Sequence, residues 1–174
     1  MIARKIFWAL CTYAEYFFWN KLGWKSFVGR PAYILRKKNI SIGSRVRILY
    51  GVRMECGANG KIIIEDNVSI GPNCNITAYG TVIIKSGVTI SANCFITDMD
   101  HDISFSSMSV MDAPNMVLST IIGKNSFIGA NSVILAGTEL RDSVVVGANS
   151  TVRGVFGPAQ IVAGSPARVK GQRV

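Results

Sequence analysis

The stretch Ile121–Val152 reads IIGKNSFIGANSVILAGTELRDSVVVGANSTV, and its period decides the fold. An aliphatic side chain recurs at every sixth position, and four positions after it a small or medium side chain returns. A helix has a period near 3.6 and a flat strand a period of about 2, so neither explains this spacing. Short strands joined by tight corners do explain it, because each face then turns one aliphatic side chain onto the coil below. The aliphatic positions are Ile122, Ile128, Ile134, Leu140, Val146 and Val152.

A β-sandwich with regular turns is the competing interpretation of this pattern. It would place successive strands roughly 8–12 residues apart. The hexad instead keeps one phase throughout the stretch, which favours a parallel β-helix. The spacing does not give the hand of that helix, and parallel crossovers are right-handed as a general rule.

The repeat extends toward the N-terminus in two longer coils. Residues 58–77 and 78–97 align at an offset of twenty, which is two residues more than three hexads need. We expect the extra residues at corners near Asn59–Gly60 and Tyr79–Gly80, because Asn and Gly tolerate the positive φ of tight turns.

The repeat stops at Asp98–Thr120, which reads DMDHDISFSSMSVMDAPNMVLST and has no hexad phase. The aliphatic phase resumes at Ile122, so we expect this segment to be a loop that stands off the stack. Functional residues are common on loops held by a rigid scaffold. His101, the only histidine of the chain, lies at the start of this loop.

These features together resemble the hexapeptide-repeat acyltransferases. The fragment AGSPARVKG near the C-terminus is similar to the pattern that ends the helix in that family, and the lead-in to KNISIG is similar to acetyltransferases of bacterial surface-polysaccharide synthesis. The resemblance covers about Asn39–Gly171 and implies a left-handed parallel β-helix. The expected fold is therefore all-β, with a basic, aromatic helical segment over residues 1–38, a hexapeptide-repeat domain over 39–174 and a catalytic loop over about 98–120.

The resemblance implies that His101 is the catalytic base, because Asp98-Met99-Asp100-His101 matches the family context of that residue. Imidazole has an ordinary pKa near 6.5, so at neutral pH it can accept a proton from a sugar hydroxyl and pass it to a departing thiolate. A carboxylate on the other ring nitrogen would orient the ring. Asp98 and Asp100 are the local candidates for that role, and an acid from a neighbouring chain remains an alternative.

The same resemblance implies the contacts of acetyl-CoA. The backbone N–H of Ala130 corresponds to the oxyanion donor, and Ala148 corresponds to the position that contacts the pantetheine arm. Arg168 matches the phosphate-binding position, with Lys170 beside it. Arg153 stands where relatives often have Thr followed by Lys, but here a glycine follows, so the phosphate-binding set departs from the family pattern.

The positive charge of the chain is concentrated at its N-terminal end. Met1–Arg53 carries 11 Lys and Arg against one acid, Glu15, whereas the remainder carries 8 against 9. This asymmetry implies an anionic partner, which could be lipid head groups, nucleic acid or an acidic substrate. For the chain as a whole we expect acetyl-CoA and a saccharide acceptor as partners, and no nucleic acid.

The segment Met1–Leu22 is aromatic and has basic residues near both ends. Its apolar run from Ile6 to Trp19 is shorter than the roughly 20 residues of a membrane span and contains Glu15. It also lacks a signal-peptide cleavage site. Two interpretations remain: a helix lying on an anionic membrane surface, and a helix packed on its own β-helix or on a neighbouring subunit. We expect a cytoplasmic protein, with peripheral contact at the inner face of the cytoplasmic membrane in the first case.

The four cysteines contain no C-x-x-C pair, and with one histidine they predict no metal site. A reducing compartment is the simplest interpretation, with Cys74 and Cys94 as interior fillers of adjacent coils. A metal-dependent hydratase of the β-helix type needs three histidines and is excluded by the single histidine. A non-catalytic, ice-binding solenoid would show a regular threonine ladder, which this sequence lacks.

The sequence therefore predicts an acetyl-CoA-dependent O-acetyltransferase that acts by direct transfer on a saccharide hydroxyl in surface-polysaccharide biosynthesis. The alternative is an N-acetyltransferase on a nucleotide-linked amino sugar, although many such proteins resemble a β-helix preceded by an α/β domain. The resemblance also implies a homotrimer with the cofactor groove between adjacent chains.

Overall fold

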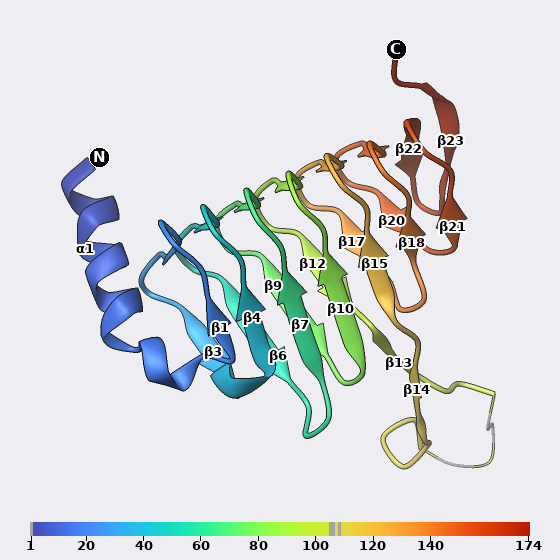
Figure 1. Ribbon diagram of the computed structural model, residues 1–174. Coiled ribbons are helices and arrows are strands. Elements are labelled where there is room, and N and C mark those ends of the chain that lie inside the picture. Colours follow the sequence, from blue (N-terminus) through green and yellow to red (C-terminus); the bar gives the residue numbers. More distant parts are fainter. Residues whose placement is uncertain (1, 105–106, 108) are drawn as a thin grey trace.

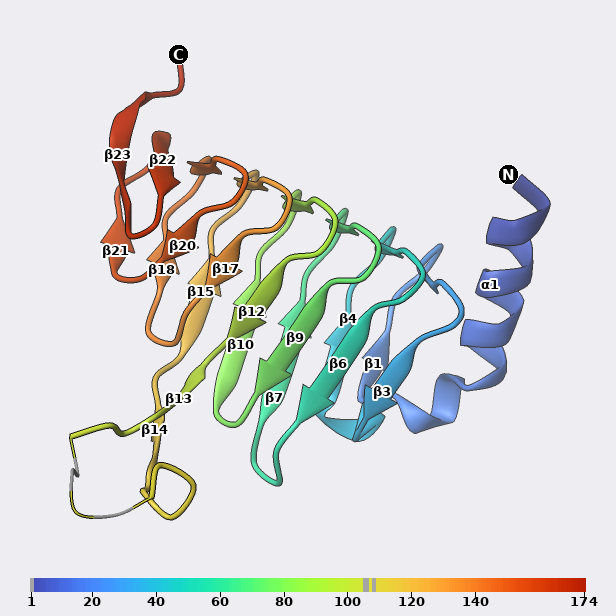
Figure 2. The same cartoon turned by 180° about the vertical axis from the view of Figure 1, so that it is seen from behind.

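The computed structural model describes residues 2–104, 107 and 109–174 (Figure 1). It is a left-handed parallel β-helix: the hexad pattern predicts the parallel β-helix, and the family resemblance predicts its left hand. Three parallel sheets form the faces of a prism, a helix covers its N-terminal end, and one loop projects from its side (Figures 1 and 2).

Within the coils, each strand pairs in parallel with the strand one coil away, so the three strands of a coil belong to three different sheets. The exceptions are the last two strands of sheet B and the ribbon of the projecting loop, which pair antiparallel with each other. Sheet A contains β1 (Lys21–Leu22), β4 (Ile40–Ile42), β7 (Lys61–Ile64), β10 (Thr81–Ile84), β15 (Thr120–Ile122), β18 (Glu139–Leu140) and β21 (Val155–Phe156). Sheet B contains β2 (Phe27–Val28), β5 (Arg47–Ile48), β8 (Ser69–Ile70), β11 (Thr89–Ile90), β16 (Phe127–Ile128), β19 (Val145–Val146), β22 (Gln160–Gly164) and β23 (Ala167–Gln172). Sheet C contains β3 (Tyr33–Leu35), β6 (Arg53–Cys56), β9 (Asn75–Ala78), β12 (Phe95–Thr97), β17 (Val133–Ile134) and β20 (Thr151–Val152). The remaining elements are α1 (Ile2–Ala14), the short 3₁₀ helices η1 (Tyr16–Phe18) and η2 (Lys37–Asn39), and the ribbon of β13 (Met99–His101) and β14 (Asn115–Val117).

The core is a column of aliphatic side chains along the prism axis. The register stacks Ile64 on Ile84, Ile84 on Ile122 and Ile122 on Leu140, and all four side chains are buried. The small residues four positions later are also buried where they are Ser or Thr. Their hydroxyls hydrogen-bond to backbone carbonyls at the corners, as Ser126 does to Arg141 O at 3.2 Å. Both halves of the hexad pattern are therefore confirmed.

The corners between faces use the residues that tolerate a left-handed backbone. Asn93, Asn131 and Asn149 follow one another up the edge between sheets B and C, with φ of 59°, 59° and 56°. Asparagine accepts this conformation more readily than other side chains with a Cβ. The longer corners also lie where they are predicted, between β6 and β7 and between β9 and β10.

The N-terminal boundary differs from the sequence prediction. Residues 23–36, which the sequence analysis assigns to the N-terminal helical segment, belong to a complete coil in which β1, β2 and β3 pair with β4, β5 and β6. The β-helix thus begins at Lys21 rather than at Asn39. The hexad phase is present there in Leu22, Val28 and Ile34, but Gly and Pro at the corners obscure it.

The buried cysteines lie where the sequence predicts them. Cys74 and Cys94 are buried in adjacent coils, whose strands β9 and β12 pair with each other. All four cysteines are free thiols. Burial raises the pKa of the Cys56 thiol to about 11, so this side chain remains uncharged in the core.

The aliphatic column predicts a large difference between inward and outward substitutions. Ile76 is 0% exposed and Val155 is 61% exposed. Ile76→Ala should cost about 2–5 kcal/mol, because it removes buried methyl groups and leaves a cavity. Val155→Ala is the control and should cost less than about 0.5 kcal/mol. Thermal and denaturant unfolding of both variants measure the difference, and equal losses would contradict the column as the source of stability.

Candidate active site at the loop after the fourth coil

The excursion leaves the prism at the edge where sheet C passes to sheet A. It starts after β12 and returns at β15, which pairs directly with β10 of the preceding coil. Its base is the antiparallel ribbon of β13 and β14 (Figure 1). In this ribbon His101 lies opposite Asn115. The stack therefore continues in register across the insertion, and the ribbon carries His101 away from the prism.

His101 has one ring nitrogen with no partner. Its side chain is half-buried, and its Nδ1 atom is buried without a hydrogen bond to any described residue. Its backbone N–H donates to Asp100 Oδ1 at 3.0 Å. A buried polar atom normally has a partner, so a group from outside the described contacts is needed to satisfy this nitrogen.

Asp98 stabilises the base of the loop, a role that the sequence analysis did not predict. The residue is buried, and its two carboxylate oxygens accept hydrogen bonds from the backbone N–H groups of Tyr79 (2.7 Å) and Gly80 (2.8 Å). Its carbonyl oxygen also accepts from Leu118 N–H at 2.8 Å. Asp98 thus ties both ends of the loop to the corner of the previous coil. It makes no hydrogen bond to His101, so the expectation that it orients the imidazole is not supported.

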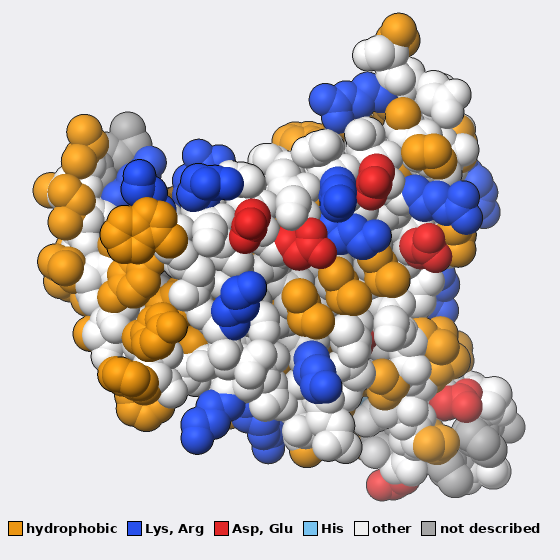
Figure 3. All heavy atoms as spheres, viewed as in Figure 1, with side chains coloured by type: hydrophobic (Ala, Val, Ile, Leu, Met, Phe, Trp, Pro, Cys, Tyr) orange, Lys and Arg blue, Asp and Glu red, His pale blue; other side chains and the backbone are white. Residues whose placement is uncertain are grey.

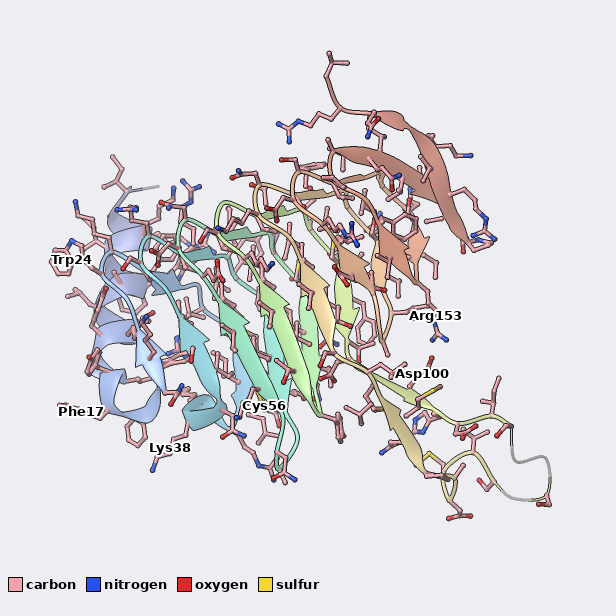
Figure 4. The ribbon with its side chains drawn as sticks, turned by 45° about the vertical axis from the view of Figure 1, so that its right-hand side comes forward. Phe17, Trp24, Lys38, Cys56, Asp100 and Arg153 are labelled. Carbon is pink, nitrogen blue, oxygen red and sulfur yellow. The ribbon has the colours of Figure 1, made fainter. Side chains whose placement is uncertain are left out.

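Asp100 is paired with Arg153 rather than with the imidazole. Its Oδ2 atom accepts from Arg153 Nη2 in an ion pair whose two side chains are both about half-exposed. Arg153 lies between β20 and β21, at the same edge of the prism as the loop (Figure 4). The arginine expected to contact the cofactor therefore braces the base of the loop that carries His101.

Ala130 and Ala148 lie at a different edge, between sheets B and C. They stack on one another, since Asn149 N–H donates to Ala130 O at 2.9 Å. Gly129 fits beneath them only as glycine, because a Cβ there would approach Ala148 N to 2.5 Å. The N–H groups of Ala130 and Ala148 have no hydrogen-bond partner in the described part of the chain, so both are free to act as donors.

Arg168 and Lys170 lie on β23, the last strand of sheet B, which pairs antiparallel with β22. Both side chains are exposed. Within residues 2–104, 107 and 109–174 no carboxylate forms an ion pair with either of them, and Arg168 Nη1 donates to Ala167 O at 2.9 Å. These cations are therefore available to an anion from outside.

Two negative findings concern the residues that the structure describes. No group of three or more His, Cys, Asp or Glu side chains is arranged to hold a metal ion among them. No helix in these residues is both long and apolar enough to cross a membrane.

The repeat itself is shared with a known family, described as "Hexapeptide repeat of succinyl-transferase". Its profile matches residues 61–98 and 119–153, which flank the loop on both sides. WbbJ of Escherichia coli strain K12, named for lipopolysaccharide biosynthesis O-acetyl transfer, is 32% identical over 147 residues. The match covers 80% of this chain and 74% of WbbJ.

Solved structures of acyltransferases have the same architecture. AntD, an N-acyltransferase of Bacillus cereus in complex with dTDP and 3-hydroxybutyryl-CoA, superposes with a TM-score of 0.83 at 21% identity, over 93% of this chain and 87% of AntD. The acetyltransferase VCA0836 of Vibrio cholerae, complexed with acetyl coenzyme A, superposes with a TM-score of 0.64 at 25% identity, over 94% and 77% of the two chains. With WbbJ matched over most of its length, the chain belongs to the hexapeptide-repeat acyltransferases.

Proposed function

We propose that the chain is an acetyl-CoA-dependent O-acetyltransferase that modifies a saccharide hydroxyl in surface-polysaccharide biosynthesis. The observation that carries this proposal is the position of His101, on a braced ribbon at the break in the coil stack. The similarity to WbbJ supports a hydroxyl as the acceptor and a surface saccharide as the substrate class.

His101 is proposed to act as the general base. A sugar hydroxyl is a weak nucleophile until its proton is removed, and acetyl-CoA supplies an acyl group already activated as a thioester. The imidazole takes the hydroxyl proton and later delivers it to the thiolate. Because the thioester is already activated, the acetyl group passes directly to the hydroxyl, and no covalent enzyme intermediate is needed. The free N–H group of Ala130 suits the remaining requirement, a backbone donor for developing negative charge, and the free N–H group of Ala148 suits a contact with the pantetheine arm of CoA. This direct transfer requires no metal.

The geometry supports a homotrimer as the active form. His101, Asp100 and Arg153 lie at the edge between sheets C and A, whereas Ala130 and Ala148 lie at the edge between sheets B and C. One chain does not bring the two groups together. A neighbouring copy that places its alanine edge against the loop would do so, and a cyclic arrangement of three copies gives three equal sites. Such a neighbour could also provide the partner that His101 Nδ1 lacks.

The cations on β23 suit the phosphates of CoA. Arg168 and Lys170 are exposed and carry no carboxylate partner in the described residues, so binding an anion would break no ion pair. Arg153 is already engaged by Asp100 and is therefore assigned to the loop and not to the phosphates.

An N-acyltransferase on a nucleotide-linked amino sugar is the alternative outcome, as the shared fold with AntD allows. Free-thiol release from acetyl-CoA across matched hydroxyl and amino sugars separates the two. Transfer to hydroxyl sugars is expected. Transfer confined to amino sugars would overturn the O-acetyl assignment while leaving the role of His101 in place.

Removing the base should abolish most of the turnover. His101→Ala should lower acetyl transfer roughly 10²–10⁴-fold, the usual contribution of general acid–base catalysis. Ile103→Ala, an exposed position on the same loop, is the matched control and should keep wild-type rates. Initial-rate assays of both variants measure this, and near-wild-type turnover in His101→Ala would refute the assignment.

Asp98 and Asp100 should contribute differently to the free energy of unfolding. Asp98→Ala leaves two backbone N–H groups without their acceptor and should cost about 1–3 kcal/mol in the free energy of unfolding. Asp100→Asn breaks only a half-exposed ion pair and should cost about 1 kcal/mol or less. Unfolding curves compare the two. A larger stability loss in Asp100→Asn would reverse these roles.

The phosphate assignment predicts a loss of CoA affinity. Arg168→Ala should weaken CoA binding roughly ten- to a hundred-fold, since a charge-assisted hydrogen bond contributes about 1.5–3 kcal/mol. If Arg168 contacts the 3′-phosphate, dephospho-CoA should lose less affinity than CoA does. Lys124→Ala, at an exposed corner between sheets A and B, is the control for a general loss of positive charge. Calorimetry gives the affinities, and unchanged CoA binding would make Arg168 an ordinary surface charge.

A further inference from the structure

The helix α1 is docked on the β-helix by the side that carries Trp8 and Thr12. Thr12 Oγ1 donates to Trp8 O at 2.7 Å and accepts from Val28 N–H at 2.9 Å, and Thr12 is fully buried. Trp8 packs on Phe27, with ring centroids 5.9 Å apart. These contacts fix which side of the helix faces the protein body.

The opposite side of α1 is apolar and has no partner in the described residues. Ile2, Ile6 and Leu10 follow one another at four-residue spacing, so they form one row on the helix surface. Leu10 is 66% exposed, and Phe7 beside this row is exposed as well. An amphipathic helix of a globular protein normally turns its apolar stripe inward. Here the stripe faces outward.

Aromatic residues extend this apolar side beyond the helix. Phe17 of η1 is 89% exposed and Trp24 of the first coil is 71% exposed. Both side chains lie at the N-terminal end and point away from the β-helix (Figure 4). The space-filling view shows hydrophobic side chains gathered over this end with Lys and Arg beside them (Figure 3). We call the surface made by Ile2, Ile6, Phe7, Leu10, Phe17, Phe18 and Trp24 the N-terminal apolar surface.

The charges near this surface are positive. Lys5, Lys21 and Lys25 are exposed, and each lies within three residues in sequence of a member of this surface. The single acid of the first 53 residues, Glu15, bonds to Arg30 at 2.8 Å and to Lys37 at 2.7 Å. Burial raises the pKa of Glu15, but the hydrogen bonds from Lys37 and Arg30 outweigh burial and hold it below its usual range. Glu15 is therefore an anion whose charge is already compensated.

We propose that the N-terminal apolar surface docks on an anionic lipid bilayer, at the cytoplasmic face of the membrane. Phe and Trp side chains with flanking Lys suit the head-group layer, where the ring is buried and the charge meets lipid phosphate. The helix α1 has 13 residues, so it lies in the plane of the interface and does not cross it. A second copy of the chain is a poorer occupant, because two such ends would bring like charges together.

The test uses the full chain and vesicles of stated composition. Intact protein is sedimented with phosphatidylglycerol–phosphatidylcholine vesicles and with phosphatidylcholine vesicles, at low and at high salt. Binding to the anionic vesicles at low salt is expected, with at least a tenfold loss at high salt or on neutral vesicles. Failure of the intact protein to bind anionic vesicles at low salt would overturn the proposal.

Substitutions locate the contact. The triple variant Ile6→Ser, Leu10→Ser, Phe17→Ser changes only exposed side chains and should bind anionic vesicles at least tenfold more weakly. Val155→Ser and Ile103→Ser, both exposed but distant, form the matched control and should bind like the intact protein. Wild-type binding by the triple variant would contradict the proposal.

Three further measurements separate membrane docking from a subunit contact and from a loss of the fold. Melting temperature and oligomeric state are measured for every variant, and both should stay unchanged. If the triple variant instead loses oligomers while the intact protein never binds vesicles, the surface is a subunit contact and the membrane assignment fails. Acetyl transfer to a small soluble acceptor should survive in the triple variant, so failure of the docking proposal and failure of the proposed activity are distinguishable.

Discussion

The whole structure depends on stacking aliphatic side chains of similar size at a fixed step along one axis. Every coil donates backbone hydrogen bonds to the next, as Gly123 N–H does to Leu140 O at 2.7 Å, and places its aliphatic side chains on those of its neighbour. The two interactions reinforce one another because both require the same register. A shift of one residue would turn the aliphatic column to solvent and the polar residues inward. The six-residue repeat of the sequence reflects this requirement for one fixed register.

An excursion of more than twenty residues is compatible with such a stack only where its ends are held together. Asp98 and Leu118 close the loop at its base, and Val82 pairs with Thr120 as if no residues intervened. Loop-closure entropy grows slowly with length, so the insertion adds a modest cost once its ends are fixed. The fold thereby gains a projecting ribbon for His101 without losing the continuity that stabilises it.

The sequence predicted features that follow from its period and missed those that depend on neighbours in space. The column, the corners and the position of His101 all follow from phase and from its interruption. The first coil was missed because its corners contain Gly23, Gly29 and Pro31, which are typical of connectors as well. The tasks of Asp98 and Arg153 could not be found in the same way. Asp98 lies nearly twenty residues in sequence from the backbone N–H groups that it binds, and Arg153 lies 53 residues from Asp100. No local sequence pattern indicates either pairing.

Because every coil has the same rise, the number of coils fixes distances along the axis of the β-helix. Adjacent coils lie about 4.8 Å apart, the ordinary spacing of paired strands. The loop emerges after β12, three coils beyond β3 at the α1 end, so the step fixes its base about 14 Å further along the axis. Inserting or deleting one whole coil between them would move the loop by one step and leave its own geometry intact. In a β-helix the number of coils, and not side-chain chemistry, therefore determines how far a reactive group lies from the end of the protein.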